Sequence, residues 1–176
     1  VRASMTASWL LQMGWRDVFV LGDAFAAPRV VGPHAPHIPG FDAAPAADLP
    51  PSKLNAMLKA GEAVVIDLAD SIRHRAGHIP GARFATRARL LDHVPELPEL
   101  ADDKTLVLTA ADDVLSRLAA ADLAEAGIEC RVLAGGNTAW AADGFPLESG
   151  FENNLDPSKD VWYRPYDMDD SDEGAM

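Results

Sequence analysis

The sequence has almost no cysteine. Cys130 is its single thiol, so the chain cannot form an intramolecular disulfide. No apolar run is long enough to cross a bilayer or to resemble a secretory signal, and a cytoplasmic location is therefore the default expectation. Because Cys130 stands at the start of a predicted buried strand, we expect an inert core thiol rather than a reactive one.

Positive charge is also scarce. The 15 Lys and Arg residues are outnumbered by 27 Asp and Glu residues, which gives a net charge of -12 and a pI near 4.6. Nucleic acid and anionic membranes both bind basic patches, so we expect neither as a partner. Apolar residues make up 48% of the 176 positions, which is enough for one well-packed domain with extensions.

The segment from Thr105 to Gly136 has the pattern of a strand, a loop, a helix and a second strand. A short apolar run at residues 106–108 predicts a buried parallel strand. Apolar residues at steps of three and four then predict a helix over residues 114–126, with Asp113 as its N-cap and Gly127 as its end. The next strand begins at Val132 and Leu133.

The loop inside this unit decides its chemistry. In such a loop the backbone N–H groups and the helix dipole favour a bound anion or a thiolate. Here Asp112 and Asp113 would repel an incoming anion, while Ala110 and Ala111 offer no nucleophile.

Residues 1–23 predict a helix from Ala3 to Met13 and a strand from Val18 to Leu21. The helix begins without a preceding strand, which suggests a piece of a longer protein. Arg2 through Gly14 align without a gap on Leu115 through Gly127, and this self-similarity indicates an internal repeat. In the alignment Arg2 stands where the later copy has Leu115.

Residues 24–49 predict an extended linker, because seven of the thirteen prolines lie between residues 24 and 51. His34 and His37 are three residues apart there. No cysteine or carboxylate partner is close, so we do not expect them to bind a metal.

The main domain begins near residue 50. A helix starts at Ser52 and ends at Gly61, and residues 63–68 predict a buried strand that contains Asp67. The alternation of strands and helices with short connections predicts an α/β fold whose parallel sheet is covered on both faces.

Two signatures frame this domain, DLADSIRHRAGHIPGA at residues 67–82 and VLAGGNTAWAADGFP at residues 132–146. Together they resemble the rhodanese-like sulfurtransferase family. The matching residues are Asp67, Gly77, His78, Ile79, Pro80, Gly81, Ala82, Gly135, Gly136, Trp140, Gly144 and Pro146.

The resemblance covers about residues 50–150 and implies an α/β, rhodanese-like fold with a parallel five-stranded sheet and helices on both faces. By the same comparison, residues 1–23 resemble the C-terminal helix and strand of a preceding rhodanese module. Residues 151–176 then form an acidic C-terminal extension, and the chain resembles the C-terminal part of a tandem-rhodanese protein.

The resemblance implies a catalytic cysteine at the first position of the loop after the central strand. This cysteine takes a sulfane sulfur from thiosulfate or a related donor as a persulfide and passes it to a thiophilic acceptor. An arginine near the end of the loop binds the anionic donor. Carried over by position, the cysteine falls on Ala110 and the arginine on Leu115. The loop also does not match the Cys-x5-Arg pattern of phosphatases. The arginine of that pattern would align with Ser116, one residue before Arg117.

The resemblance thus implies a vestigial loop without its functional groups. This vestigial loop comprises Ala110, Ala111, Asp112, Asp113, Val114, Leu115 and Ser116.

The other polar residues have structural interpretations. We expect Asp67 and His78 to hold the turn after the strand through backbone hydrogen bonds. His74 and His78 are four residues apart, but Gly77 and Pro80 break any helix there, so we expect no shared metal site.

We also expect Trp140 in the core, a solvated basic cluster at Arg83, Arg87 and Arg89, and tail aromatics at Trp162, Tyr163 and Tyr166 that lie on a protein surface.

Three interpretations of function stay open. The domain is a catalytically silent module, structural or regulatory to an active module of a multi-domain thiosulfate sulfurtransferase. Alternatively, the chain takes part in sulfur transfer with a nucleophile just upstream of Val1, five positions ahead of Arg2. The third interpretation is a pocket that binds a cation or an amine through Asp112 and Asp113.

The first two interpretations share their partners. These are other rhodanese modules of the same protein, and the sulfur donor reaches the chain only through the upstream module. We expect no cofactor and no resident metal.

Overall fold

The computed structural model describes residues 2–23, 26, 32, 37–45, 48–101 and 103–161. The chain divides into two compact units, Val1–His37 and Ile38–Met176. His34 and the tail aromatics predicted to lie on a surface are outside the described residues. In the described part of the chain, no helix is long and apolar enough to cross a lipid bilayer.

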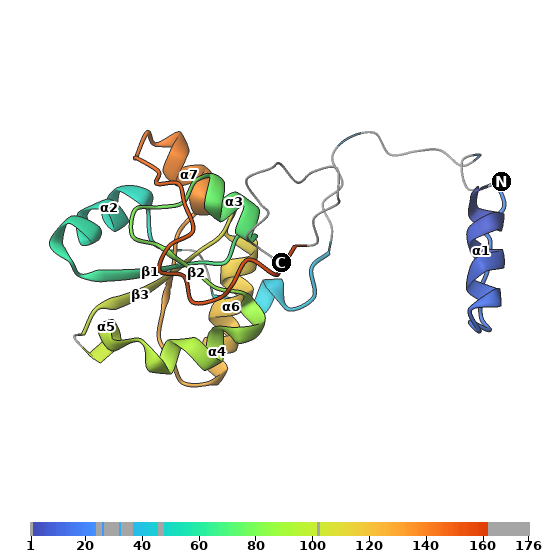
Figure 1. Cartoon of the computed structure of the whole chain (residues 1–176), viewed down its shortest axis with the longest axis horizontal. Coiled ribbons are helices and arrows are strands. Elements are labelled where there is room, and N and C mark those ends of the chain that lie inside the picture. The colour runs from blue at the N-terminus through green and yellow to red at the C-terminus, as the bar shows by residue number, and fades with distance from the viewer. Residues whose placement is uncertain are drawn as a thin grey trace. The chain divides into compact units, whose positions relative to one another are not determined.

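The secondary structure alternates between helices and short strands along the second unit (Figure 1). The elements in chain order are α1 (Arg2–Gln12), η1 (Phe41–Ala43), α2 (Pro51–Ala60), β1 (Ala63–Asp67), α3 (Ser71–Ala76), β2 (Arg83–Phe84), η2 (Arg87–Arg89), α4 (Leu90–His93), η3 (Val94–Glu96), α5 (Pro98–Ala101), β3 (Thr105–Thr109), α6 (Val114–Glu125), β4 (Arg131–Val132) and α7 (Gly136–Ala142).

The strands form a parallel sheet in the order β2-β1-β3-β4. β1 and β3 pair over their whole length, and their last residues, Asp67 and Thr109, lie side by side. The predicted α/β fold with a parallel sheet is therefore confirmed. The described residues form four strands rather than the five that the resemblance implies.

One further residue pairs with the chain at the end of β4. Leu49 donates to the carbonyl of Val132 (3.1 Å) and accepts from the N–H of Ala134 (2.9 Å), as an isolated parallel bridge with Leu133. Pairing stops there because the next residue in register to donate to this strand is Pro51, which has no N–H, and α2 begins at the same residue.

Helices cover both faces of the sheet, because successive side chains of a strand point to opposite faces (Figure 1). Val64 and Ile66 of β1 pack in one core with residues of α4 and α6. Val65 packs in a second core with residues of α2 and α7, among them Trp140, which is fully buried as predicted.

The predicted strand at Val18–Leu21 is wrong for the described residues. α1 has the expected position, but residues 15–21 form no strand. An extended segment becomes a stable strand only when a neighbour accepts and donates its backbone hydrogen bonds, and the described residues supply no such neighbour here.

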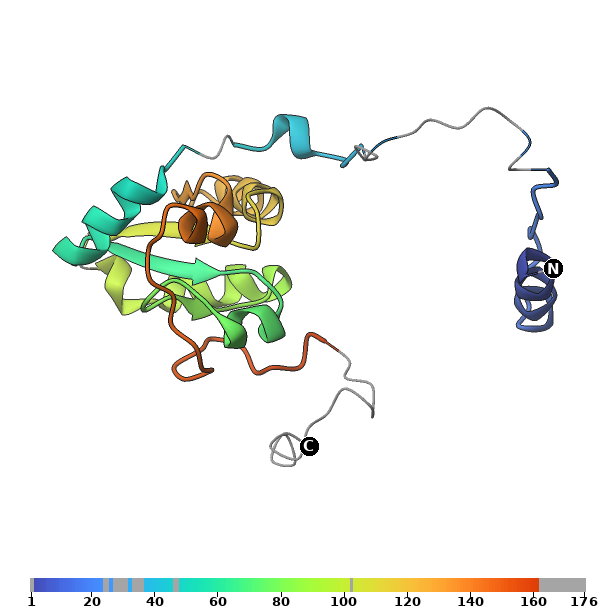
Figure 2. The ribbon, with the colours of Figure 1, turned by 90° about the horizontal axis from the view of Figure 1, so that it is seen from above.

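The free edge of β2 is covered by residues 148–160, which we call the edge segment (Figure 2). The backbones of Glu148 and His78 exchange two hydrogen bonds of 2.8 and 2.9 Å. Further along, the Asn154 side chain accepts from the N–H of Phe84, and the Asp160 side chain accepts from the N–H of Ser71. The edge segment thus satisfies backbone donors that an exposed edge strand would leave unpaired.

Candidate functional site

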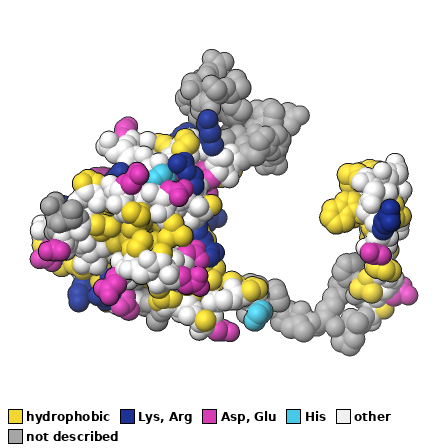
Figure 3. Space-filling view, turned by 90° about the horizontal axis from the view of Figure 1, so that it is seen from below, with side chains coloured by type: hydrophobic (Ala, Val, Ile, Leu, Met, Phe, Trp, Pro, Cys, Tyr) yellow, Lys and Arg dark blue, Asp and Glu magenta, His cyan; other side chains and the backbone are white. Residues whose placement is uncertain are grey.

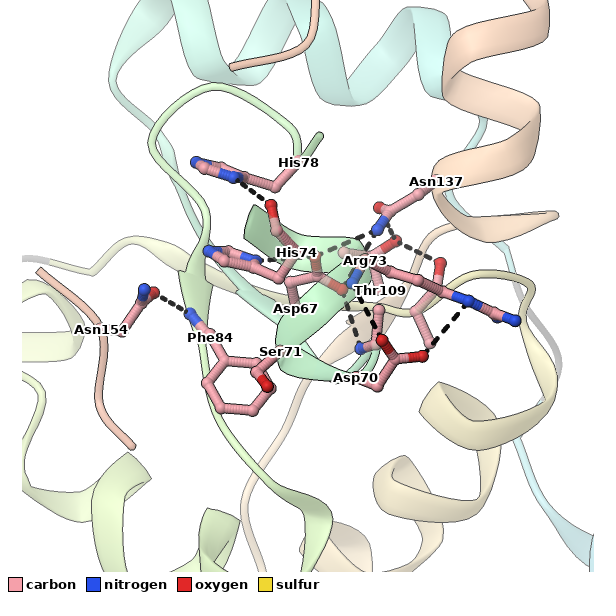
Figure 4. Close-up of polar contacts among 12 residues, drawn as sticks. Asp67, Asp70, Ser71, Arg73, His74, His78, Phe84, Thr109, Asn137 and Asn154 are labelled. Atoms are coloured by element: carbon pink, nitrogen blue, oxygen red, sulfur yellow. Dashed lines mark hydrogen bonds and ion pairs between the residues drawn. The ribbon is translucent and has the colours of Figure 1, made fainter. Parts of the chain in front are cut away.

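The ends of β1 and β3 place polar side chains together at the carboxyl edge of the sheet (Figure 4). Asp67 ends β1 and is fully buried. Its Oδ2 lies 2.9 Å from Nδ1 of His74, and Nδ2 of Asn137 donates to both of its carboxylate oxygens at 3.1 Å. Asn137 in turn accepts from the Thr109 hydroxyl at 2.9 Å, so β1, β3, α3 and α7 are joined through one carboxylate.

The Asp67 side chain also holds the turn that follows β1. Its Oδ1 accepts from the N–H of Ala69 at 3.0 Å, which is the backbone bond expected from the sequence. The role of Asn137 could not be deduced from the two signatures. A polar residue directly after the Gly135–Gly136 pair was its only sequence signal.

His74 and His78 stack on each other instead of converging on a metal. Their ring centroids are 4.0 Å apart and nearly parallel. Nδ1 of His78 donates to the carbonyl oxygen of His74 at 2.8 Å, while Nε2 of the buried His74 has no partner among the described residues. No group of three potential metal ligands exists in the described part of the chain. Both histidines therefore hold α3 and the turn after it in place.

The backbone of the vestigial loop is engaged by the start of α7. The carbonyl oxygen of Ala110 accepts from the N–H of Asn137 at 2.7 Å. That of Ala111 accepts from both the N–H and the hydroxyl of Thr138, at 3.1 and 2.6 Å. Two carbonyl dipoles of the loop thus point at α7.

Gly136 allows this close approach. Its φ is +59°, and a Cβ atom there would overlap the carbonyl oxygen of Ala110 and lie 2.6 Å from that of Asp112. A side chain at this position would push the backbone of the vestigial loop away from α7.

Replacing Gly136 with alanine should therefore lower the free energy of unfolding by about 2–3 kcal/mol, from backbone overlap and a left-handed φ together. The matched control is Gly144→Ala, where φ is +76° but a Cβ meets nothing within 4 Å. That change should cost only about 1 kcal/mol. Urea unfolding followed by circular dichroism checks both values, and equal losses would contradict the close contact.

Asp113 is the N-cap residue of α6, as expected, but the side-chain hydrogen bond to the first turn comes from Asp112. Oδ1 of Asp112 accepts from the N–H of Val114 at 3.0 Å. The φ of -88° and ψ of -1° of Asp113 are helical, and its side chain makes no capping bond. A helical backbone directs its side chain away from the N–H groups of the next turn, so the hydrogen bond comes from the side chain of the preceding residue.

The last two residues of the vestigial loop are uncharged, and Arg117, which follows the loop, is engaged elsewhere. Leu115 packs against the core that contains α6, and Ser116 is buried with its hydroxyl donating to the carbonyl of Asp113 at 3.3 Å. The guanidinium of Arg117 lies 3.9 Å from the ring centroid of Phe41, and its Nε donates to the carbonyl of Pro45 at 2.8 Å. Arg117 therefore fastens residues 41–45 to α6.

Cys130 lies at the other end of the sheet from the vestigial loop. It immediately precedes β4, whereas Ala110 follows the carboxyl end of the neighbouring parallel strand β3. The thiol is half-buried, and burial, followed by the charge of Asp48, raises its pKa to about 11. At neutral pH it is protonated and a poor nucleophile, in agreement with the expected inert thiol.

The basic cluster predicted at the surface is paired with acidic residues. Arg87 makes two hydrogen bonds to the Asp122 carboxylate, of 2.6 and 2.9 Å. The Arg87 hydrogen bond lowers the pKa of Asp122, and the carboxylate in turn raises the pKa of Arg87. Arg89 binds Asp156 of the edge segment at 2.6 Å.

Comparison with known proteins agrees with this architecture. A crystal structure of thiosulfate sulfurtransferase from Pseudomonas aeruginosa is 35% identical, with a TM-score of 0.71, over 97% of this chain and 32% of that chain. This chain thus spans about a third of the length of that relative. No match was found among curated proteins.

Two shorter structures match part of this chain. A protein from Rhodopseudomonas palustris, described as of unknown function and a possible tyrosine phosphatase, is 30% identical over 57% of this chain and 83% of that chain, with a TM-score of 0.51. A rhodanese-like domain from Anabaena is 26% identical over 68% of this chain and 90% of that chain, with a TM-score of 0.52.

A family model described as the rhodanese-like domain matches residues 50–143, from the helix before β1 to the end of α7. The match spans the sheet, the vestigial loop and the buried Asp67 network. The chain therefore belongs to the rhodanese-like domain family and is related in structure to thiosulfate sulfurtransferase.

Proposed function

We propose that residues 38–161 form a catalytically silent rhodanese-like domain, structural or regulatory to an active module of a multi-domain thiosulfate sulfurtransferase. One observation carries the proposal: the loop after β3 begins with Ala110, whose methyl group cannot carry a sulfur atom. Persulfide chemistry needs a thiolate at the site, and a methyl group cannot supply one.

Three further features of the loop support the absence of sulfur-transfer activity. Leu115 packs on the core where an anionic donor would need an arginine. The carbonyls of Ala110 and Ala111 are bound to α7, and Asp112 adds a carboxylate to the first turn of α6. A loop with this arrangement disfavours an anion such as thiosulfate.

The partners under this proposal are other rhodanese modules of the same polypeptide, and the sulfur donor binds the upstream module. The relative from Pseudomonas aeruginosa supports this arrangement, because it matches nearly all of this chain and is about three times as long. We also propose a cytoplasmic location, since the single cysteine of this chain cannot form an intramolecular disulfide.

Assays of thiosulfate-to-cyanide sulfur transfer test the proposal on three proteins. The 176-residue chain should give no thiocyanate, and the full-length protein should turn over. The full-length protein without residues 38–176 should lose rate or thermal stability because its active module loses a supporting surface. An unchanged rate and stability after the deletion would overturn the structural role.

Cys130→Ser is the matched control in the full-length protein. Because Cys130 lies at the opposite end of the sheet and its thiol stays protonated, we expect the same sulfur-transfer rate with serine. A loss of rate would assign the sulfur to Cys130 and contradict the proposal.

A second candidate is a direct part in catalysis, with the nucleophile just upstream of Val1. It is favoured by the alignment of Arg2 with Leu115, since Leu115 occupies the family's arginine position and Arg2 is exposed at the start of α1. The sequence of the full-length gene tests it. A cysteine five positions ahead of Arg2 supports the candidate, and any other residue there removes it.

A further inference from the structure

A cavity of about 500 Å³ opens at the amino edge of the sheet. Its wall includes residues of α2, the first residues of β1, Arg83 at the start of β2 and Lys104 directly before β3. The vestigial loop follows the carboxyl end of β3, so this amino-edge cavity lies at the opposite edge of the sheet from the loop. Its volume falls within the range of about 300–1,000 Å³ that is typical of small-molecule sites.

The charged side chains that line the amino-edge cavity are all cationic. They are Lys59 of α2, Arg83 and Lys104, and no Asp or Glu among the described residues lines it. The chain as a whole has 27 acidic and 15 basic residues, and acidic side chains are spread over the face of the domain that Figure 3 shows. A larger cavity next to α6 is lined by charges of both signs, for example Asp103 and Arg131. Positive potential is therefore a local feature of the amino-edge cavity.

Two of these three cations are available to a ligand. Lys59 and Lys104 make no hydrogen bond or ion pair within the described part of the chain. Arg83 is already engaged, since its Nε donates to the carbonyl of Asn153 in the edge segment at 3.3 Å. The two ammonium groups line one cavity and repel each other, and an anion placed between them replaces this repulsion with attraction.

Most of the remaining wall is apolar. Leu58, Pro146 and the buried Trp140 contribute to it, and the indole N–H of Trp140 donates to the carbonyl of Pro146 at 2.8 Å. Because that donor is already used, Trp140 can offer a ligand only the apolar part of its ring. Such a wall favours a ligand with an apolar body over a bare inorganic ion, since removing apolar surface from water is favourable.

We propose that the amino-edge cavity binds a small organic anion, with a carboxylate, sulfonate or phosphate group on an apolar body. The ammonium groups of Lys59 and Lys104 pair with the anionic group, and Leu58 and Pro146 pack against the body. The ligand binds at the opposite edge of the sheet from the vestigial loop, so its binding does not depend on sulfur-transfer chemistry.

NMR titrations of the 176-residue chain at low salt test the proposal with naphthalene-1-sulfonate, inorganic phosphate and 1-naphthol. The sulfonate should shift the amide signals of Ala63 and Gly81 and bind at least about 10-fold more tightly than phosphate or 1-naphthol, because only the sulfonate has both the charge and the body. Added salt should weaken its binding, since the charges are partly exposed. No shift of these two signals at about 10 mM sulfonate, or equally tight binding of phosphate or 1-naphthol, would overturn the proposal.

Substitutions that remove positive charge locate the site. Lys59→Gln combined with Lys104→Gln should weaken binding of naphthalene-1-sulfonate at least about 10-fold. The matched control is Lys53→Gln, because Lys53 is exposed on the same helix as Lys59 and does not line the cavity. Its effect should stay within about 2-fold. If the double variant does not fold, Lys59→Gln alone gives the same comparison. An equal loss in the Lys53 variant would show that only the net charge matters, and would contradict the assigned cavity.

Discussion

Replacing Asp67 with alanine should lower the free energy of unfolding by about 3–5 kcal/mol, because it leaves several buried polar groups without their shared acceptor. His74, Asn137 and the N–H of Ala69 all bind this carboxylate, whose side chain is fully buried. For a domain of this size the melting temperature should fall by roughly 10–20 °C. Thermal unfolding followed by circular dichroism measures the loss.

The control for Asp67 lies three residues away. Asp70 caps α3 through the N–H of Arg73 and pairs with the same arginine at an exposed position. Asp70→Ser keeps a capping oxygen and removes only the exposed ion pair, so it should change the stability by less than about 1 kcal/mol. A comparable loss in both variants would show that Asp67 is not the centre of the site's structure.

Replacing Asp156 with alanine should cost about 3 kcal/mol and loosen the edge segment. Its side chain is 2% exposed and accepts from the N–H and hydroxyl of Thr86 at 2.8 Å, from Arg89 at 2.6 Å, and from His93 at 2.8 Å. Faster hydrogen exchange of the Phe84 amide would report the loosening, since Asn154 of the same segment accepts from it.

The Asp156 effect should also depend on pH. Burial raises the pKa of Asp156, but the hydrogen bonds from Thr86 and His93 outweigh burial and hold the pKa below its ordinary value. A carboxyl with a lowered folded-state pKa stabilises the protein above the unfolded pKa of about 3.9, and this contribution disappears as the pH falls through the folded pKa. The difference between wild type and Asp156→Ala should therefore be largest near neutral pH and shrink in acid.

Asp122→Asn provides the comparison for Asp156. Asp122 also binds an arginine, but its side chain is 39% exposed, so its loss should cost no more than about 1 kcal/mol. If the Asp122 and Asp156 variants lose equal stability, the edge segment is not held by a buried carboxylate.

Much of the fold could be predicted because its helices and central strands are encoded locally. β3 and α6 follow from a short apolar run and from apolar spacing that ends at Gly127. The strand at Val18–Leu21 failed because the same local pattern needs a neighbour to pair with. The pairing beyond β4 is limited to Leu49 because the next donor in register is Pro51, which has no N–H.

The sequence predicts the local hydrogen bonds of the site, but not the bonds between residues that are distant in the chain. The turn-holding bond of Asp67 follows from a general preference of aspartate after a strand. Its bond to Asn137 joins residues 70 positions apart, and only the paired ends of β1 and β3 bring them together. The capping role of Asp112 was missed because two adjacent aspartates are equivalent in sequence, and the backbone angles of Asp113 decide between them.

The Asp67 network and the vestigial loop have separate roles. The network fixes the ends of β1 and β3 and the start of α7 whether or not the neighbouring loop is reactive. The side chains of Ala110 and Leu115 take no part in the hydrogen bonds around Asp67, and Ala110 meets this network only through its backbone carbonyl, which accepts from the N–H of Asn137.

Intact-mass measurement of the purified 176-residue chain after incubation with thiosulfate tests catalytic silence most directly. We predict an unchanged mass and no thiocyanate on addition of cyanide, because the vestigial loop has no thiol and the Cys130 thiol is held protonated by its raised pKa. A mass gain of one sulfur atom that cyanide removes would contradict this account.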